Sequence, residues 1–215
     1  MESTRTNEVK VLSYLRYSAN RQRRFEKHAK VVVERMAEAW GLQVLQNDDK
    51  RVISEIRKRL QDPDWHPSGD DLYVTDIPVW DDARQSVVLL EIETRSEDHF
   101  SYLLHYYNCY SAGQRDVLSK YSTVHVPFRK EVNGNISDLY IGINKGCTQY
   151  FLMEMETVHH FAALGPVLQD SSDNEGGTVD AEPYIDIPNT PEYVKYSDVP
   201  EGCGLTPLPQ DWIDI

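Results

Sequence analysis

Acidic residues gather in two segments whose patterns predict neighbouring β-strands. Asp71 opens the first segment, and Glu91 and Glu93 stand two positions apart in the second. Side chains at positions i and i+2 of a strand point to the same face of a sheet, so the two glutamates are expected to point the same way. Carboxylate oxygens suit Mg²⁺, which needs only one or two of them plus a substrate phosphate. The spacing therefore indicates a metal site that activates water for attack on a phosphate ester.

A hairpin is needed to bring these segments together. Residues 71–80 alternate between apolar and polar or aromatic side chains, and residues 86–94 are rich in β-forming residues. The polar residues 81–85 between them suit a hairpin loop. We take the turn to centre on Ala83.

With that turn, Thr75 opposes Glu91 and the faces of the hairpin are fixed. Asp71, Glu91 and Glu93 share one face, while Asp76 points to the other. Asp71 is then diagonal to Glu93, and positions so related are about 7–8 Å apart at the backbone. This arrangement depends on the turn, because one extra residue in the loop would change which residues of the two strands share a face.

An Asp that opens one strand, followed by Glu-x-Lys on the next, is the signature of the PD-(D/E)xK nuclease superfamily. This stretch resembles it through Asp71, in Gly-Asp-Asp-Leu-Tyr-Val, and through Glu91-Ile92-Glu93. Glu93 stands in the lysine position, as in some type II restriction enzymes of the superfamily. Gly69 and Asp70 stand where a proline usually precedes the first aspartate. As an order of elements, the resemblance covers roughly residues 25–156.

The resemblance implies a DNA endonuclease that depends on Mg²⁺ or Mn²⁺, with Asp71, Glu91 and Glu93 as catalytic residues. In this family a glutamate from an early helix often completes the metal site. Glu34 is therefore a candidate ligand beside Asp71 and Glu91, and Glu55 is a weaker one.

A competing interpretation is that the glutamates form the solvated face of an edge hairpin. Glu154 and Glu156 repeat the Glu-x-Glu spacing later in the chain. Such pairs can be simple solvent faces, so the spacing alone does not establish a metal site.

Charge is unevenly distributed along the chain. The net charge of −13 disfavours a nucleic-acid binder. Residues 1–60, however, hold 14 Lys+Arg and 8 Asp+Glu and carry +6, whereas residues 61–215 hold 8 Lys+Arg and 27 Asp+Glu and carry −19. A basic end suits a DNA-facing patch, and it equally suits self-association of basic and acidic parts, as in a homodimer. A solvated helix face is the third interpretation. The residues assigned to DNA contact are Arg21, Arg23, Arg24, Lys27, Arg57 and Lys58.

Apolar spacing predicts helices over residues 25–40 and 51–60, and Ser96 is the expected cap of a third helix that includes residues 100–110. This third helix is unusually aromatic, which suits either base stacking or packing on the sheet. Short helices are also expected at 9–17 and 114–121. Further strands are expected at 122–129, 138–143 and 147–157.

These elements predict an α/β domain over residues 1–165, with a mixed central sheet of about five strands flanked by helices, as in restriction endonucleases. Residues 166–215 predict an extended, loop-rich C-terminal arm that contains several prolines, carries 11 acidic residues and has Lys195 as its one basic residue. Apolar anchors such as Tyr184, Tyr196 and Trp212 predict that the arm packs on the domain or on a neighbouring subunit.

Three function classes follow. The leading one is the metal-dependent DNA endonuclease, and the alternative is a non-catalytic structural or assembly protein, such as a viral one, that acts through the acidic arm. An acidic DNA mimic is a third, which the basic first 60 residues fit poorly. The three cysteines are scattered, the first thirty residues are polar, and no window of about 18 apolar residues occurs. We therefore expect no membrane contact and a cytoplasmic location, the host cytoplasm if the protein is viral.

Overall fold

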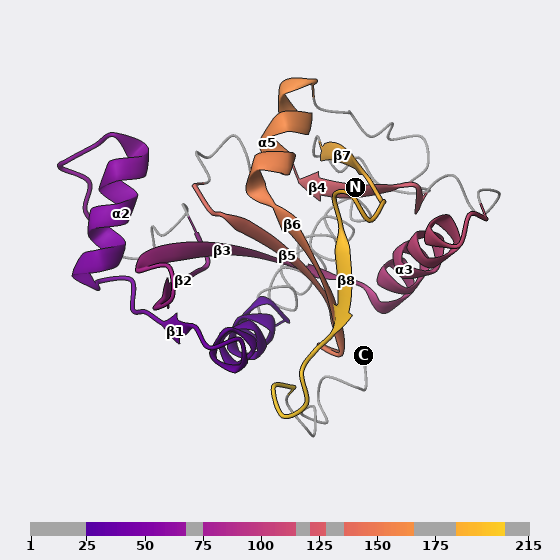
Figure 1. Cartoon of the computed structure of the whole chain (residues 1–215), viewed down its shortest axis with the longest axis horizontal. Coiled ribbons are helices and arrows are strands. Elements are labelled where there is room, and N and C mark those ends of the chain that lie inside the picture. The colour runs from indigo at the N-terminus through magenta and orange to yellow at the C-terminus, as the bar shows by residue number, and fades with distance from the viewer. Residues whose placement is uncertain (1–24, 68–74, 115–120, 128–135, 166–183, 205–215) are drawn as a thin grey trace, which may run out of the picture.

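A six-stranded mixed sheet runs through the structure, a computed structural model that describes residues 25–67, 75–114, 121–127, 136–165 and 184–204. The strand order is β1-β2-β3-β5-β6-β8, and a separate two-stranded sheet pairs β4 with β7 (Figure 1). The α/β class and the mixed sheet predicted from the sequence are confirmed, with six strands in the main sheet rather than about five.

The strands of the main sheet are β1 (Gln43–Val44), β2 (Ile77–Asp81), β3 (Ser86–Arg95), β5 (Leu139–Asn144), β6 (Gln149–Glu154) and β8 (Lys195–Asp198). Those of the small sheet are β4 (Thr123–Pro127) and β7 (Tyr184–Pro188). Strands β3 and β5 are parallel, while the other neighbouring pairs are antiparallel. A parallel pair needs a long crossover connection, and here the crossover contains α3 (Glu97–Ser111) and β4.

Local signals predicted the early helices well. The first described helix covers residues 25–39, and α2 (Lys50–Leu60) begins after Asp49, whose side chain accepts a hydrogen bond from the Arg51 N–H at 2.8 Å. Helix α3 begins after the expected cap, Ser96. These starts depend on residues within a few positions of the helix end, which is why the sequence alone identifies them.

The predicted strand over residues 147–157 is wrong at its end. Strand β6 stops at Glu154, and α5 (Met155–Ala163) begins at the next residue. Met155, Val158 and Ala162 are buried at helical spacing. The second Glu-x-Glu pair, Glu154 and Glu156, therefore spans a strand end and the first turn of a helix and does not share a strand face.

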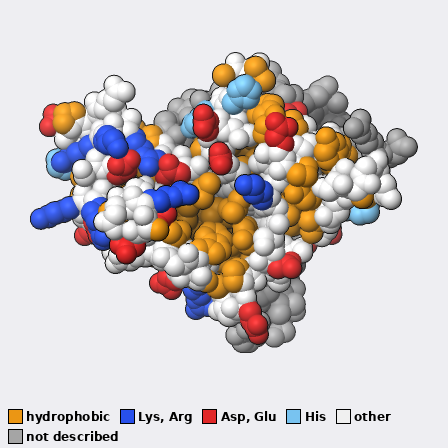
Figure 2. All heavy atoms as spheres, in the orientation of Figure 1, with side chains coloured by type: hydrophobic (Ala, Val, Ile, Leu, Met, Phe, Trp, Pro, Cys, Tyr) orange, Lys and Arg blue, Asp and Glu red, His pale blue; other side chains and the backbone are white. Residues whose placement is uncertain are grey.

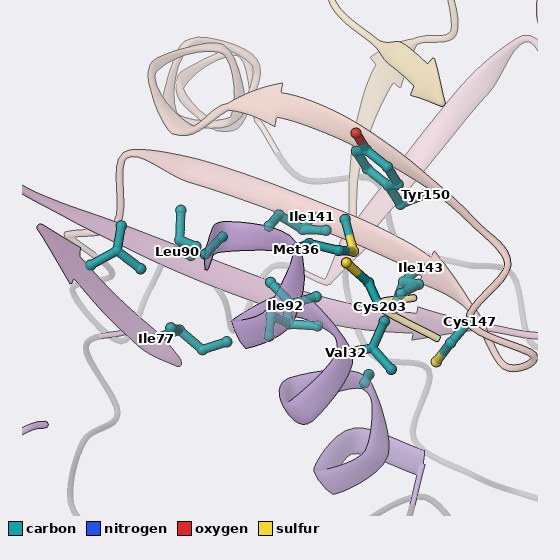
Figure 3. Close-up of a cluster of buried hydrophobic side chains, with 14 residues drawn as sticks. Val32, Met36, Ile77, Leu90, Ile92, Ile141, Ile143, Cys147, Tyr150 and Cys203 are labelled. Atoms are coloured by element: carbon teal, nitrogen blue, oxygen red, sulfur yellow. The ribbon is translucent and has the colours of Figure 1, made fainter. Parts of the chain in front are cut away.

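The helix over residues 25–39 covers one face of the sheet. Its Val32 and Met36 pack on Leu90, Ile92 and neighbouring aliphatic side chains of β5 (Figure 3). Even-numbered residues at the centre of β3 therefore point to this helix. Odd-numbered residues point to the opposite face, because successive side chains of a strand alternate.

That opposite face carries two separate hydrophobic clusters. Val52 and Ile56 of α2 pack on Val87 and Leu89 of β3. The second cluster joins α3, α5, the small sheet and the outer strands, and its members include Phe100, Leu103, Val124, Tyr140, Phe151, Val158 and Ile187. Gly142 belongs to this packing, since a Cβ there would lie 2.0 Å from the Phe151 ring.

The described part of the C-terminal arm, residues 184–204, is built into both sheets. Strand β7 pairs with β4 and β8 pairs with β6, whereas the sequence predicted an extended, loop-rich arm and identified no strand in it. Ile185, Ile187 and Val194 have no exposed surface. The expected helix at residues 9–17 and most of that at 114–121 lie outside the described residues.

Candidate carboxylate site on strand β3

The β2–β3 hairpin is shifted by one position from the predicted register. Ile77 faces Leu90, whereas a turn centred on Ala83 would place it opposite Leu89. The loop contains the four residues 82–85, and Gln85 adopts a left-handed conformation with φ 52°. The predicted turn is therefore wrong, because a four-residue loop pairs odd positions with even ones.

Asp76 lies just before β2, and its side chain bonds to the backbone of β3. Its N–H donates to the Leu90 carbonyl oxygen at 3.0 Å, and its Oδ2 accepts from the Ile92 N–H at 2.8 Å. Ile92 separates Glu91 from Glu93 in the chain. The Asp76 carboxylate, which the sequence predicted to point to the other face, is thus held against the strand between the two glutamates.

Glu91 and Glu93 lie at the centre of the sheet. Glu91 is only 4% exposed and pairs with Tyr140 of β5, while the partly buried Glu93 pairs with Gly142. Because β3 is flanked by β2 and β5, the competing interpretation of a solvated edge hairpin is wrong. A buried carboxylate is costly unless it is compensated, so this position requires charge neutralisation or hydrogen bonding.

The two glutamates also mark a boundary between hydrophobic clusters. Val87 and Leu89, on the same face of β3, belong to the α2 cluster, whereas Tyr140 belongs to the α3 cluster. Glu91 and Glu93 continue this face of β3 beyond Leu89. Glu91 and Glu93 therefore form a polar strip between the part of the sheet that α2 covers and the part that α3 covers.

Arg95 extends the polar strip by one more i+2 step. It donates to the Tyr140 hydroxyl at 3.1 Å and to the His125 carbonyl oxygen. Burial disfavours its charge, but Tyr140 and Glu93 raise the pKa of Arg95 above its ordinary value. The strip thus places a persistent cation beside the carboxylates. The sequence interpretation stopped at Glu93, although the same spacing reaches Arg95.

Beyond Arg95 lies a group of half-buried polar residues from three elements. His125 of β4 lies 3.6 Å from Asp186 of β7 (Nδ1 to Oδ1), and the ring centroids of His99 and His125 are 6.5 Å apart. Burial, with contributions from Arg95 and His125, lowers the pKa of His99 to about 4. Burial also lowers the pKa of His125, against the opposing effect of Asp186. No local sequence motif links these residues. The pairing of β4 with β7 brings His125 and Asp186 together.

The remaining predicted metal ligands do not join this site. Asp71 lies outside the described residues. Glu34 belongs to the helix over residues 25–39, which packs on the opposite face of the sheet. Glu55 pairs with Arg59 at 2.9 Å. Within the described ranges, no three side chains of the His, Cys, Asp and Glu types are close enough together to hold a metal ion.

The predicted DNA-contact residues have different surroundings. Arg21, Arg23 and Arg24 lie outside the described residues, and Lys27 is exposed. Arg57 Nε donates to the Trp65 carbonyl oxygen at 2.8 Å, and its Nη2 contacts the His66 ring. Lys58 has a side chain that is 78% exposed. Arg57 therefore holds the following loop in place, and Lys58 is the freer cation.

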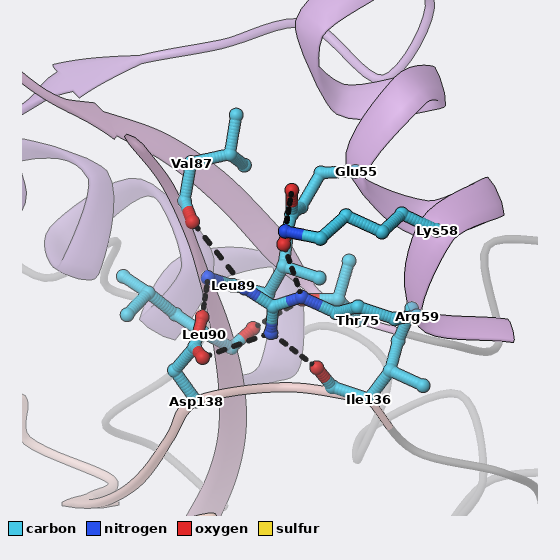
Figure 4. A network of polar contacts seen from close by, with 9 residues as sticks. All are labelled: Glu55, Lys58, Arg59, Thr75, Val87, Leu89, Leu90, Ile136 and Asp138. Carbon is cyan, nitrogen blue, oxygen red and sulfur yellow. Dashed lines mark hydrogen bonds and ion pairs between the residues drawn. The ribbon is translucent and has the colours of Figure 1, made fainter. Parts of the chain in front are cut away.

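Arg59, which the sequence did not single out, anchors α2 to the sheet. Its guanidinium donates to Glu55 at 2.9 Å and to Asp138 at 2.8 Å (Figure 4). It also donates to the carbonyl oxygens of Ile136 and Val87. The Asp138 carboxylate in turn accepts from the Leu89 N–H at 2.8 Å. The network ties α2 to the starts of β3 and β5.

A polar groove of about 790 Å³ runs beside α2. Its lining includes the basic residues Arg51, Lys58 and Arg84 and the acidic residues Glu154 and Glu156. Figure 2 shows that lysine and arginine side chains gather on the side of the molecule formed by α2. We call this side the basic surface of α2, although acidic side chains lie among its cations.

Comparison with protein-family models, curated proteins and solved structures finds no match to this chain. The described helices include none with the length and apolar character needed to cross a membrane. Cys109, Cys147 and Cys203 are free thiols. Burial, with a contribution from Glu97, raises the pKa of the Cys147 thiol to about 12.

Proposed function

We propose that this chain is a metal-dependent endonuclease that hydrolyses phosphodiester bonds in DNA. The observation that carries the proposal is the placement of Asp76 against β3 between Glu91 and Glu93, at the centre of the sheet. Helix α3 follows β3 and packs on the sheet, and this placement fits the order of elements in the nuclease resemblance.

The donor set suits a hard divalent cation. Asp76, Glu91 and Glu93 do not form a three-ligand site, but Mg²⁺ or Mn²⁺ needs only one or two carboxylates when a substrate phosphate supplies further ligands, so one or two of these residues would hold it. When bound, the ion would polarise the phosphoryl group and lower the pKa of the attacking water. Arg95 stands beyond Glu93, where its charge offsets that of the carboxylates and favours an anionic substrate. Asp71 remains a candidate fourth carboxylate.

The lysine and arginine side chains of α2 favour an anionic polymer as the substrate. Lys58, Arg51 and Arg84 line the groove together with acidic residues, and Lys27 is an exposed cation on the helix that covers the opposite face of the sheet. Contacts with phosphates depend on such cations and weaken steeply with added salt.

The alternative, an assembly protein that acts through its C-terminal arm, receives less support. Residues 184–204 are occupied in the chain's own sheets. The free thiols agree with the cytoplasmic location that the sequence predicts, which stays a prediction.

The test is nicking of supercoiled plasmid with Mg²⁺ or Mn²⁺, with EDTA as the blank. We expect Glu91→Gln and Asp76→Asn each to reduce the rate on the order of 100-fold or more. Glu38→Gln is the matched control for cleavage, because Glu38 is exposed on the helix that covers the opposite face of the sheet. Glu156 lines the groove beside α2, so Glu156→Gln serves as a control for metal binding only. Asp71→Asn decides whether the first aspartate of the resemblance also acts.

Calorimetric titration with Mn²⁺ separates metal binding from catalysis. The proposal predicts that Glu91→Gln weakens Mn²⁺ binding and that Glu156→Gln leaves it unchanged. Absence of cleavage by the unaltered chain with either ion, together with absence of Mn²⁺ binding, would contradict it. Cleavage by Glu91→Gln at the rate of the unaltered chain would show that Glu91 of β3 takes no part in the mechanism.

A further inference from the structure

A second hollow, which we call the α2 pocket, is formed by the exposed face of α2 and by the loop that follows this helix (Figure 1). Its volume is about 780 Å³. The polar side chains that line it are Lys50, Arg57, Lys58, Ser54, Gln61 and His66. No Asp or Glu of the described residues belongs to this lining, although the chain contains 35 acidic residues. The composition of the pocket therefore suits an anionic ligand.

The loop that closes the α2 pocket is fixed to the helix. Arg57 Nε donates to the Trp65 carbonyl oxygen at 2.8 Å, and Arg57 Nη2 lies 3.0 Å from Nδ1 of His66. The Trp65 side chain packs against the hydrophobic cluster under α2. Asp62, an acidic residue of the loop, accepts from the N–H of Asp64 at 3.0 Å. The loop thus holds His66 at the pocket, while the Asp62 carboxylate bonds to the loop's own backbone.

The cations of α2 differ in whether a carboxylate balances them. Arg51 and Arg59 each pair with an aspartate at 2.8 Å. Among the described residues, no ion pair involves Lys50 or Arg57, and Lys58 has one at the longer distance of 3.6 Å. The balanced arginines lie outside the lining of the α2 pocket, and the cations inside it are the poorly balanced ones. A hollow lined by one sign of charge concentrates ions of the opposite sign, so the missing counter-charge would come from a ligand.

The kind of anion follows from the donors and their spread. Arginine and lysine both bind phosphate, and serine and glutamine side chains commonly donate to phosphate oxygens of nucleic acids. Lys50 and Lys58 stand eight positions apart, which is about 12 Å along the helix axis. Ser54 and Lys58 also line the groove beside α2, so the groove and the α2 pocket meet at these two residues. A polymer with a row of phosphates fits this spread of cations better than one small anion does.

We propose that the α2 pocket holds a backbone phosphate of a nucleic-acid strand that crosses α2 at Ser54 and Lys58 into the groove. The choice of a phosphate group rests on the pocket, whereas the choice of a nucleic-acid strand as its source rests on the proposed function. The pocket supplies affinity and takes no part in hydrolysis, because it lies away from the polar strip of β3. It adds Lys50 and His66 to the residues that the sequence assigned to DNA contact.

Fluorescence anisotropy of a labelled single-stranded oligodeoxynucleotide, measured in EDTA so that metal-dependent cleavage is stopped, tests the proposal. We expect Lys50→Glu to raise the Kd about tenfold and to reduce the slope of log Kd against log salt concentration by about 1, as for one lost phosphate contact. Lys50 is exposed in the first turn of α2, where glutamate is favourable, so the variant should fold, and circular dichroism checks this. Lys195→Glu is the matched control, since it makes the same change of charge at an exposed position of β8.

Competition experiments then identify the ligand. The proposal predicts that unlabelled oligonucleotide displaces the labelled strand, and that polyglutamate or a mononucleotide at the same concentration of charged groups displaces it much less. Displacement by polyglutamate as effective as that by the oligonucleotide would overturn the choice of phosphate. Equally effective displacement by the mononucleotide would overturn the choice of a strand.

The two variants also separate this proposal from the nuclease activity. Equal effects of Lys50→Glu and Lys195→Glu on binding would overturn the α2 pocket, because net charge alone would then explain the affinity. A strong effect of Lys50→Glu on binding, in a chain that cleaves no DNA with Mg²⁺ or Mn²⁺, would support the pocket and contradict the nuclease. Cleavage with a Kd that Lys50→Glu leaves unchanged would support the nuclease and overturn the pocket.

Discussion

Helices α2 and α3 both cover the same face of the sheet through hydrophobic packing, but α2 adds a network of ion pairs and hydrogen bonds around Arg59 to that packing. Five of the eleven residues of α2 are lysine or arginine, and Arg59 fixes the helix to β3 and β5 through ion pairs and hydrogen bonds. Helix α3 has no lysine or arginine and is held by aromatic and aliphatic packing around Phe100 and Leu103. Helix α2 therefore carries cations that the proposed anionic substrate would contact, whereas α3 carries no Asp, Glu, Lys or Arg after its first turn.

The strip Glu91-Glu93-Arg95 lies between these two helices. It is the part of this face of β3 that neither hydrophobic cluster fills. A substrate held by the basic surface of α2 would therefore approach the carboxylates from one side, and the half-buried histidines beside α3 border the other.

The substitution Arg59→Ala is expected to have the largest effect and tests whether ion pairs anchor α2. Its side chain is 22% exposed, and its loss would leave Asp138 without its cation and Glu55 with only the exposed Lys58 at 3.6 Å. We expect the free energy of unfolding in urea to fall by about 2–3 kcal/mol, because breaking a largely buried pair leaves uncompensated charge. Lys58→Ala, one position away and 78% exposed, is expected to change it by less than about 0.5 kcal/mol. Equal effects of the two substitutions would show that charge does not anchor α2.

Lowering the pH should reduce the stability of the folded chain through protonation of His99 in α3. The pKa of His99 is about 4 in the folded chain and ordinarily 6.5, so the unfolded chain takes up this proton first as the pH falls. The contribution to stability is complete above pH 6.5 and is lost progressively toward pH 4. Urea unfolding at several pH values is expected to show a smaller loss for His99→Gln than for the unaltered chain. His160→Gln, at an exposed position of α5, should behave like the unaltered chain.

The smallest expected difference lies in the helix caps. Asp49 accepts from the Arg51 N–H at 2.8 Å and also pairs with the Arg51 side chain, whereas Ser96 accepts from the His99 N–H at 3.4 Å. A bond of 3.4 Å is long for an N–H donor, so Ser96→Ala should cost only about 0.5 kcal/mol. Asp49→Ala should lower the melting temperature further than Ser96→Ala. The reverse order would mean that the α3 start depends more on its cap than its geometry indicates.

Only part of the candidate site could be predicted from the sequence. Glu91 and Glu93 share a face because strand geometry has a period of two, and no other part of the fold changes that. Asp76 was placed on the wrong side because its position depends on the loop, where Gln85 takes a left-handed conformation that the sequence does not signal. His125 and Asp186 were missed because 61 positions of chain separate them, and only the β4–β7 pairing joins them.

The sequence by itself determined the elements whose signals are local. The starts of α2 and α3, the helix over residues 25–39 and the long strand β3 follow from caps and apolar spacing within a few residues. Tertiary structure alone decided the hairpin register, the start of α5 at Met155 and the recruitment of residues 184–204 into two sheets. Strands β7 and β8 pair with strands that are distant in the sequence, and Ile185 and Ile187 are buried only once that pairing forms, so their own residues carry little of the signal that makes them strands.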